Sequence, residues 1–158
     1  MRIISEKELW LLSHFRQNAR ESLTKISRNT KVPVSTIFDK LKHYEGNLIK
    51  KHTTILDFTK LGFLAKAQAM LQLSPSQREE AKEFLLKCDN VNSLYKINNG
   101  YDYLIEFIFR DMRELEDFIG EFEKKFDVRK KQLFYIVDEI QRENFMANPE
   151  LMKININN

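Results

Sequence analysis

The sequence predicts an α+β protein, with an N-terminal winged helix-turn-helix domain followed by a ferredoxin-like βαββαβ domain. Apolar residues change near residue 61 from helical spacing to strict alternation. A Val-Pro-Val turn around Pro33 separates two short helical segments. Charge is also uneven: residues 1–60 hold 12 Lys/Arg and 6 Asp/Glu, while residues 61–158 hold 14 and 17. A basic first part and an acidic second part indicate a polyanion-binding module joined to a module with another role.

Two helices are expected before the turn. Ser5 and Glu8 have the spacing of a capping box, and the apolar stripe that follows predicts a helix ending near Asn18. Ser22 is placed to cap a second helix that runs to about Thr30. Together they would form the first part of a three-helix unit.

A third helix follows Pro33, and Ser35 is expected to cap it. Its apolar stripe consists of Ile37, Leu41 and Tyr44, at positions i, i+4 and i+7. The opposite face is polar, and the break between the second and third helices is typical of a helix-turn-helix. The next segment, LIKKHTTILDF, predicts a two-stranded wing with basic residues near its start.

The second half predicts the order β-α-β-β-α-β. Residues 63–73 alternate as a strand, and Ser76 with Glu79 predicts a capping box opening a helix. Strands at residues 91–97 and 101–109 are joined by an Asn-Asn-Gly turn, and a helix capped at Asp111 precedes a strand near residues 128–137. The expected domains are residues 1–60 and residues 61–158, the second including a C-terminal tail.

An open four-stranded sheet with helices on one face leaves the other face to be covered. Tyr103, Ile105, Phe107 and Phe109 line one face of the expected strand, while Leu104 and Ile108 add apolar surface to the other. Both faces therefore need burial, which predicts a homodimer or larger oligomer formed through the C-terminal sheets.

Several function classes are disfavoured. The chain has no P-loop, GxGxxG or G-x-S-x-G motif, so we expect no enzyme and no cofactor. The three histidines and Cys88 lack the spacing of a metal set. A single cysteine, no long apolar run and no signal-peptide core predict a cytoplasmic protein.

The chain resembles the Lrp/AsnC family of prokaryotic, and especially archaeal, transcription regulators. The resemblance rests in the first half on NAR.S at residues 18–22, on V..ST with Ile37 and Leu41, and on Glu45 and Leu61-Gly62. In the second half it rests on V.SLYKINNGYDYLIEF, which is similar to a block of the ligand-sensing domain, often called the RAM domain. It implies DNA binding, a dimer through the C-terminal sheets and an effector site near the NNGYD turn.

In the helix-turn-helix context, the polar face of the third helix is interpreted as a double-stranded DNA contact, since a major groove admits one α-helix. Phosphate contacts are expected from residues that position without specifying, and base contacts from the helix itself. The predicted DNA-binding residues are Lys31, Ser35, Thr36, Asp39, Lys40, Lys42, His43, Lys50 and Lys51. An ordinary solvated helix face is the alternative.

For the effector, the turn is expected to hold an amino acid, with backbone amides freed by Gly100 facing its carboxylate and Asp102 facing its ammonium group. The predicted effector residues are Asn98, Asn99, Gly100, Tyr101, Asp102 and Lys131. The sequence departs from the family where Lys131 and Leu133 replace the threonines common in relatives. A plain β-hairpin is the alternative.

Two other functions remain open. One is a low-specificity architectural DNA-binding protein without an effector. The other is a small-molecule-binding or enzymatic ferredoxin-like protein whose N-terminal half is a protein-interaction module.

Overall fold

The computed structural model describes residues 5–151 and divides the chain into two compact units. One unit consists of Met1–Ile55 together with Ile140–Asn158, and the other of Leu56–Glu139. We call them the helical unit and the sheet unit. Within residues 5–151, no helix combines the length and the apolar composition that crossing a membrane requires.

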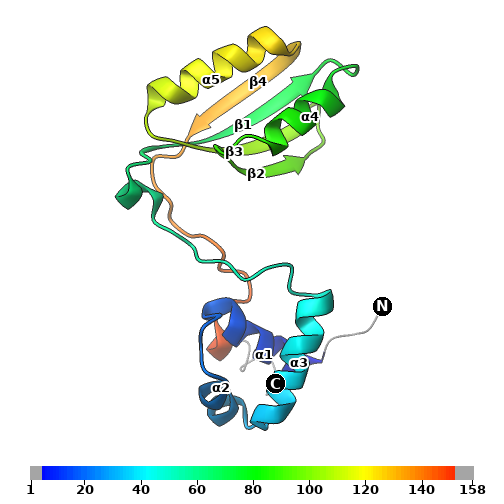
Figure 1. The fold of residues 1–158 in the computed structure, drawn as a ribbon, viewed down its shortest axis with the longest axis vertical. Helices are drawn as coiled ribbons and strands as arrows, with labels where there is room; N and C mark the ends of the chain where they lie inside the picture. The colour runs from blue at the N-terminus through cyan, green and yellow to red at the C-terminus, as the bar shows by residue number, and fades with distance from the viewer. Residues whose placement is uncertain (1–4, 152–158) are drawn as a thin grey trace. The chain divides into compact units, whose positions relative to one another are not determined.

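The helical unit contains α1 (Glu6–Gln17), α2 (Leu23–Thr30) and α3 (Val34–Asn47), as Figure 1 shows. Two expected caps are confirmed, because the Ser5 hydroxyl accepts from the Glu8 amide and the Ser22 hydroxyl accepts from the Lys25 amide. The predicted stripe of α3 faces inward, with Ile37 and Tyr44 buried. The core consists of Leu11, Leu12, Phe15, Ile26, Ile37 and Tyr44.

The start of α3 differs from the prediction. Ser35 does not cap the helix, since Pro33 is the N-cap residue and its carbonyl oxygen accepts the first helical bond, from the Ile37 amide at 3.0 Å. Proline suits this position because its fixed φ fits a helix start and its missing N–H would have no helical partner there. Ser35 and Thr36 therefore lie in the first turn of α3, exposed to solvent.

The predicted wing is wrong. Residues 49–57 form neither helix nor strand, and those from Lys50 to Asp57 are exposed. Residues 48–56 contain none of the Gly, Asn, Asp or Pro residues that tight turns use, and an isolated two-stranded hairpin is only marginally stable. A short 3-10 helix, η1 (Phe58–Leu61), follows.

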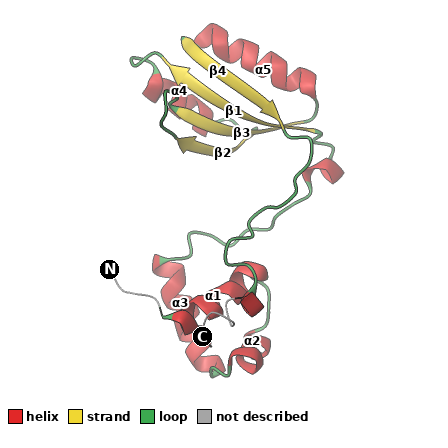
Figure 2. Cartoon of the chain, turned by 180° about the vertical axis from the view of Figure 1, so that it is seen from behind, coloured by secondary structure: helices red, strands yellow, loops and turns green. Residues whose placement is uncertain are grey.

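The sheet unit has the predicted βαββαβ order. Its elements are β1 (Ala65–Leu73), α4 (Arg78–Leu86), β2 (Val91–Lys96), β3 (Tyr103–Phe109), α5 (Met112–Lys125) and β4 (Val128–Tyr135). The strands lie in the order β2-β3-β1-β4, and each neighbouring pair is antiparallel. Figure 2 shows the four strands side by side with α4 and α5 packed against them. The ferredoxin-like prediction is confirmed.

Alternation along the strands separates the two faces of the sheet. Alternate residues of β1 from Ala65 to Leu73 are buried, as are Tyr103, Ile105, Phe107 and Phe109 of β3. These residues form one core with apolar residues of α4 and α5, including Leu85, Leu115 and Ile119. We call the other side, which these two helices leave uncovered, the open face.

The predicted capping box of the first helix in this unit does not form. The chain turns at residues 74–77, where the Gln77 amide donates to the Ser74 carbonyl oxygen at 3.0 Å, and Gln77 becomes the N-cap of α4. Pro75 favours this turn because its φ is already fixed. The Ser76 hydroxyl lies 3.2 Å from that of Ser74 instead of reaching the Glu79 amide. Further along, the Asp111 carboxylate does accept from the Glu114 amide, as predicted.

The segment after β4 differs from the expected division of domains. It groups with the helical unit from Ile140 onward, whereas we expected the whole tail in the second domain. Arg16 of α1 donates to the carbonyl oxygens of Glu143 and Phe145, both at 3.2 Å. These contacts lie far apart in sequence, and no local pattern in the tail indicates them.

Candidate nucleic-acid interface and effector site

Most of the predicted DNA-binding residues of α3 lie on one exposed face, opposite buried Ile37 and Tyr44. Helical geometry brings the first turn and the later polar positions to the same side. The Lys42 ammonium group lies 4.6 Å from the centre of the Phe38 ring, which is itself 46% exposed. The residues of this face are Ser35, Thr36, Asp39, Lys42 and His43, and we call them the α3 face.

Lys40 departs from this arrangement. Its ammonium group donates to the Glu8 carboxylate at 2.7 Å, and the Lys40 side chain is only 32% exposed. The same carboxylate accepts from the Tyr44 hydroxyl at 3.3 Å. The Lys40 hydrogen bond, followed by bonds from Ser5, lowers the pKa of Glu8 to about 2. The structure therefore brings Lys40 into the helical unit's own polar contacts.

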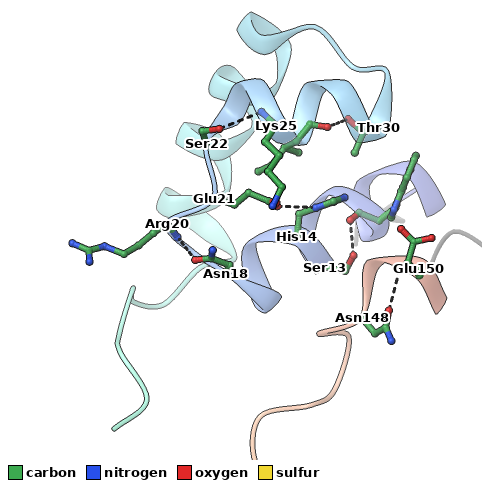
Figure 3. A network of polar contacts seen from close by, with 12 residues as sticks. Ser13, His14, Asn18, Arg20, Glu21, Ser22, Lys25, Thr30, Asn148 and Glu150 are labelled. Atoms are coloured by element: carbon green, nitrogen blue, oxygen red, sulfur yellow. Dashed lines mark hydrogen bonds and ion pairs between the residues drawn. The ribbon is translucent and has the colours of Figure 1, made fainter.

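A second charged contact joins α1 to α2 (Figure 3). The Glu21 carboxylate lies 2.9 Å from His14 Nδ1 and 2.9 Å from the Lys25 ammonium group. Burial alone would raise the pKa of Glu21, but the hydrogen bonds from Lys25 and His14 lower it. The three side chains hold the loop between α1 and α2, and so help to fix these two helices relative to each other.

The remaining predicted DNA-binding residues are basic and exposed. Lys31 is the C-cap of α2, where it adopts a left-handed conformation with φ of 59°. Lys50 and Lys51 lie in the irregular segment after α3, not at the start of a strand. All three keep their ammonium groups accessible for a phosphate, although no wing positions the last two.

The predicted effector turn forms between β2 and β3. Asn99 and Gly100 have φ values of 60° and 82°, and the Tyr101 amide donates to the Asn98 carbonyl oxygen at 3.4 Å. Positive φ at both central positions explains why the turn uses Asn followed by Gly. Asn98, Asn99 and Gly100 are exposed, while the hydroxyl of Tyr101 is buried without a hydrogen-bond partner among the described residues.

The Asp102 carboxylate is engaged within the sheet unit. One oxygen accepts from the Leu73 amide at 2.8 Å, and the other lies 2.9 Å from Arg78 Nε. The Asp102 side chain is 14% exposed. Both oxygens therefore contact β1 and α4, whereas the sequence predicts that this carboxylate faces the ammonium group of an effector.

Lys131, the remaining predicted effector residue, lies on the face of β4 that packs against α5. Strand alternation puts it on the same face as Leu133, and its ammonium group pairs with Glu123 of α5 at 2.8 Å. Its neighbour Lys130 lies on the open face instead, with its ammonium group 4.5 Å from the centre of the Tyr101 ring. Sequence reasoning missed Lys130, although the alternation of β4 could have indicated it.

The open face carries both apolar and charged residues. Phe134 and Tyr95 are 49% and 57% exposed, and Met70 and Leu104 add apolar surface between them, whereas Ile108, expected to do the same, is only 8% exposed. Lys66 pairs with Glu106 at 3.0 Å and also with Glu139. Burial alone would raise the pKa of Glu106, but hydrogen bonds from Asn92 and Lys66 outweigh it and lower the pKa.

Comparison with known proteins places this chain in a family. The sequence model of the Lrp/AsnC ligand binding domain matches residues 66–144. The chain is also 30% identical over 121 residues to the transcriptional regulator AzlB of Bacillus subtilis (strain 168), covering 74% of this chain and 77% of AzlB. The chain belongs to the Lrp/AsnC family of transcription regulators.

Other comparisons agree with this family. An uncharacterised HTH-type transcriptional regulator of Pyrococcus furiosus is 26% identical over 146 residues, covering 90% of this chain and 93% of that protein. The fold matches a transcriptional regulator of Neisseria meningitidis solved with L-methionine, at a TM-score of 0.81 and 18% identity over 89% of this chain and 94% of that one. LrpC of B. subtilis matches at 0.78 and 19% identity, covering 89% and 99%.

Membership of the Lrp/AsnC family decides between the functions left open by the sequence. The chain is a transcription regulator of the Lrp/AsnC type, and neither the architectural protein nor the ferredoxin-like protein with an interaction module is favoured. Within residues 5–151, no cluster of three or more His, Cys, Asp or Glu side chains is arranged to hold a metal ion.

Proposed function

We propose that this Lrp/AsnC regulator binds double-stranded DNA through the α3 face, assembles through the open face of its sheet and responds to an amino acid. Its activity is binding and not catalysis. The α3 face itself is the observation that carries the proposal, because its polar side chains lie opposite a buried apolar stripe. An α-helix presented in this way fits a major groove.

The contacts divide by the chemistry that each side chain offers. Ser35 and Thr36, at the N-terminal end of α3, suit phosphates or base edges, and Lys42 and His43 suit acceptors on purines. Asp39 suits the amino group of a cytosine. Lys31, Lys50 and Lys51 suit phosphates and contribute affinity without sequence preference.

A salt titration tests the DNA proposal. The affinity of the full-length protein for a duplex, measured by fluorescence anisotropy, should fall steeply as salt rises. The double variant Lys50→Ala, Lys51→Ala should bind all duplexes more weakly and flatten the logarithmic salt slope by about one unit per lost contact. An affinity that does not depend on salt would refute DNA binding, and an unchanged slope in the double variant would remove this segment from the interface.

Self-association is proposed because the open face combines exposed Phe134 and Tyr95 with further apolar residues of β1 and β3. A second copy of the same sheet would remove these side chains from water, which is the main driving force for association. Self-complementary contact through a two-fold axis is the commonest solution in soluble oligomers.

An amino-acid effector is proposed because two structural relatives, the Neisseria regulator and a feast or famine regulatory protein of Mycobacterium tuberculosis, were solved with L-methionine. The site proposed here is the turn at residues 98–101. The buried Tyr101 hydroxyl supports this location, since a buried polar group without a partner is uncommon in folded proteins. Lys130 adds a positive charge beside the Tyr101 ring for the effector's carboxylate.

A thermal-shift screen of the twenty amino acids tests the effector. A ligand at one hundred times its dissociation constant stabilises the folded state by about 2.7 kcal/mol. Tyr101→Phe should remove the shift while leaving the melting temperature of the unliganded protein nearly unchanged. If no amino acid raises the melting temperature at millimolar concentration, the effector proposal fails and a constitutive regulator is favoured.

A further inference from the structure

Hydrogen bonds from Ser5, at the start of α1, hold the carboxylate of Glu8 in place. It lies in the first turn of α1, where it accepts from the Ser5 amide at 3.1 Å and from the Ser5 hydroxyl at 2.9 Å. Glu8 is only 9% exposed. A carboxylate held by its own helix cap has little freedom to rotate, so its second oxygen points in a defined direction.

Two side chains of α3 meet the same oxygen of this carboxylate. Lys40 Nζ lies 2.7 Å from Glu8 Oε1, and the Tyr44 hydroxyl lies 3.3 Å from it. Residues four apart lie one above the other on a helix, so both contacts come from one side of α3. Each residue takes up about 100° of the helix circumference, so a small rotation of α3 would break both contacts and re-aim the α3 face.

Lys40 differs from Lys42, because it would have to break an ion pair with Glu8 in order to contact DNA. If its ammonium group moved to a phosphate, the Glu8 carboxylate would keep a negative charge in a mostly buried position without this cation. Removing one partner of such a pair is costly because the remaining charge is poorly solvated. Lys42, two residues further on, has an exposed side chain and no such carboxylate partner within residues 5–151.

We propose that Glu8 is a positioning residue for DNA recognition: by holding Lys40 and Tyr44 it sets the rotation of α3, and Lys40 acts inside the helical unit and does not contact DNA. This inference rests on the proposed DNA-binding role of the α3 face. It assigns a function to α1 that the helix-turn-helix motif alone does not give, since α1 then aims the helix that enters the groove.

A double-mutant cycle with Glu8→Gln and Lys40→Met tests the proposal. Duplex affinity and its salt slope are measured at a temperature where circular dichroism shows each variant to be folded. Each single variant should bind about 3- to 10-fold more weakly, and the double variant no more weakly than the singles, because residues acting as one unit are not additive. The salt slope should stay at the wild-type value in all three.

Two further variants serve as controls. Lys31→Met removes the same charge from a proposed phosphate contact and should flatten the salt slope by about one unit. Tyr44→Phe keeps the buried ring, removes one of the two contacts described from α3 to Glu8 and should weaken affinity less than Glu8→Gln. Tyr44→Phe also provides the test if Glu8→Gln fails to fold. The proposal is overturned if folded Tyr44→Phe keeps the wild-type affinity and Lys40→Met has a flattened salt slope.

The outcomes separate this inference from the function on which it rests. If Lys40→Met flattens the salt slope by about one unit and folded Glu8→Gln binds like the wild type, Lys40 is a phosphate contact and the positioning role is wrong. If the wild-type protein shows no salt-dependent binding to any duplex, the DNA-binding proposal itself fails, and the cycle has no affinity to report.

Discussion

Arg16 of α1 and Glu143 of the C-terminal segment form an ion pair at 2.9 Å, although 127 residues separate them in the chain. Arg16 also donates to the carbonyl oxygens of Glu143 and Phe145. One side chain therefore holds three acceptors of the segment that follows the sheet unit. The chain leaves the helical unit near residue 55 and returns to it near residue 140.

Replacing Arg16 by alanine should release this segment. Both side chains of the ion pair are about half exposed, so the loss of stability should be small, about 0.5–1 kcal/mol. Hydrogen exchange of the amides at residues 143–151 should nevertheless become faster. Arg20→Ala is the matched control, because Arg20 is exposed and its replacement should leave the exchange of this segment unchanged. Equal protection of residues 143–151 in the wild type and in Arg16→Ala would contradict the role assigned to Arg16.

The open face predicts how assembly can be broken. Phe134→Lys places a charge among the apolar residues of this face and should shift the protein from an oligomer to a monomer. Sedimentation velocity or light scattering measures the mass directly. The control is Leu86→Lys, since Leu86 is also an exposed apolar residue, at 61%, but lies on α4. If Phe134→Lys keeps the wild-type mass while Leu86→Lys becomes smaller, the helices and not the open face form the interface.

Replacing Asp102 should reduce the stability of the fold, because its carboxylate contacts β1 and α4. Asp102→Ala removes the acceptor of the Leu73 amide and the partner of Arg78, and should lower the free energy of unfolding by about 1–3 kcal/mol. Asp138→Ala, at an exposed position, should leave it nearly unchanged. Urea denaturation of both variants gives the comparison. If Asp102→Ala is as stable as the wild type, the contacts of this carboxylate do not stabilise the fold, and a role in ligand binding is favoured instead.

Acid should remove the stabilisation that comes from Glu8. Hydrogen bonds from Lys40 and Ser5 hold the pKa of Glu8 at about 2 in the folded state, below its ordinary value of 4.5. The stabilisation is therefore complete above pH 4.5 and is lost as the pH falls towards 2. The wild type should be about 1–2 kcal/mol more stable than Glu8→Gln at neutral pH, with the difference vanishing near pH 2. A difference that does not change with pH would contradict this account.

Local chemistry in the sequence accounts for much of the fold. The capping box at Ser5 and the stripe that contains Ile37 act within one or two helical turns, so spacing alone predicts them. The strands of the sheet unit were equally readable, since buried and exposed residues alternate along β1 and β3. The predicted wing is wrong because β-branched residues favour strands locally, while the segment lacks the turn residues that close a hairpin.

The misplaced site residues depend on contacts between distant segments. Lys40 looks like any basic residue at the edge of a polar helix face until α1 brings Glu8 beside it. Asp102 looks like a free turn carboxylate, but β1 and α4 supply its partners. Lys131 could have been placed correctly, because it shares a strand face with Leu133 and that face packs on α5.

We expect the α3 face to read DNA sequence. Duplexes selected by the wild-type protein from a random pool provide a target, and a scrambled duplex of the same composition provides the reference. Lys42→Ala and His43→Ala should each cost about 1–3 kcal/mol on the selected duplex and much less on the scrambled one. Lys87→Ala, an exposed lysine of the sheet unit, should change neither affinity. Equal losses on the two duplexes at fixed salt would contradict the claim and leave α3 as a phosphate-binding helix without sequence preference.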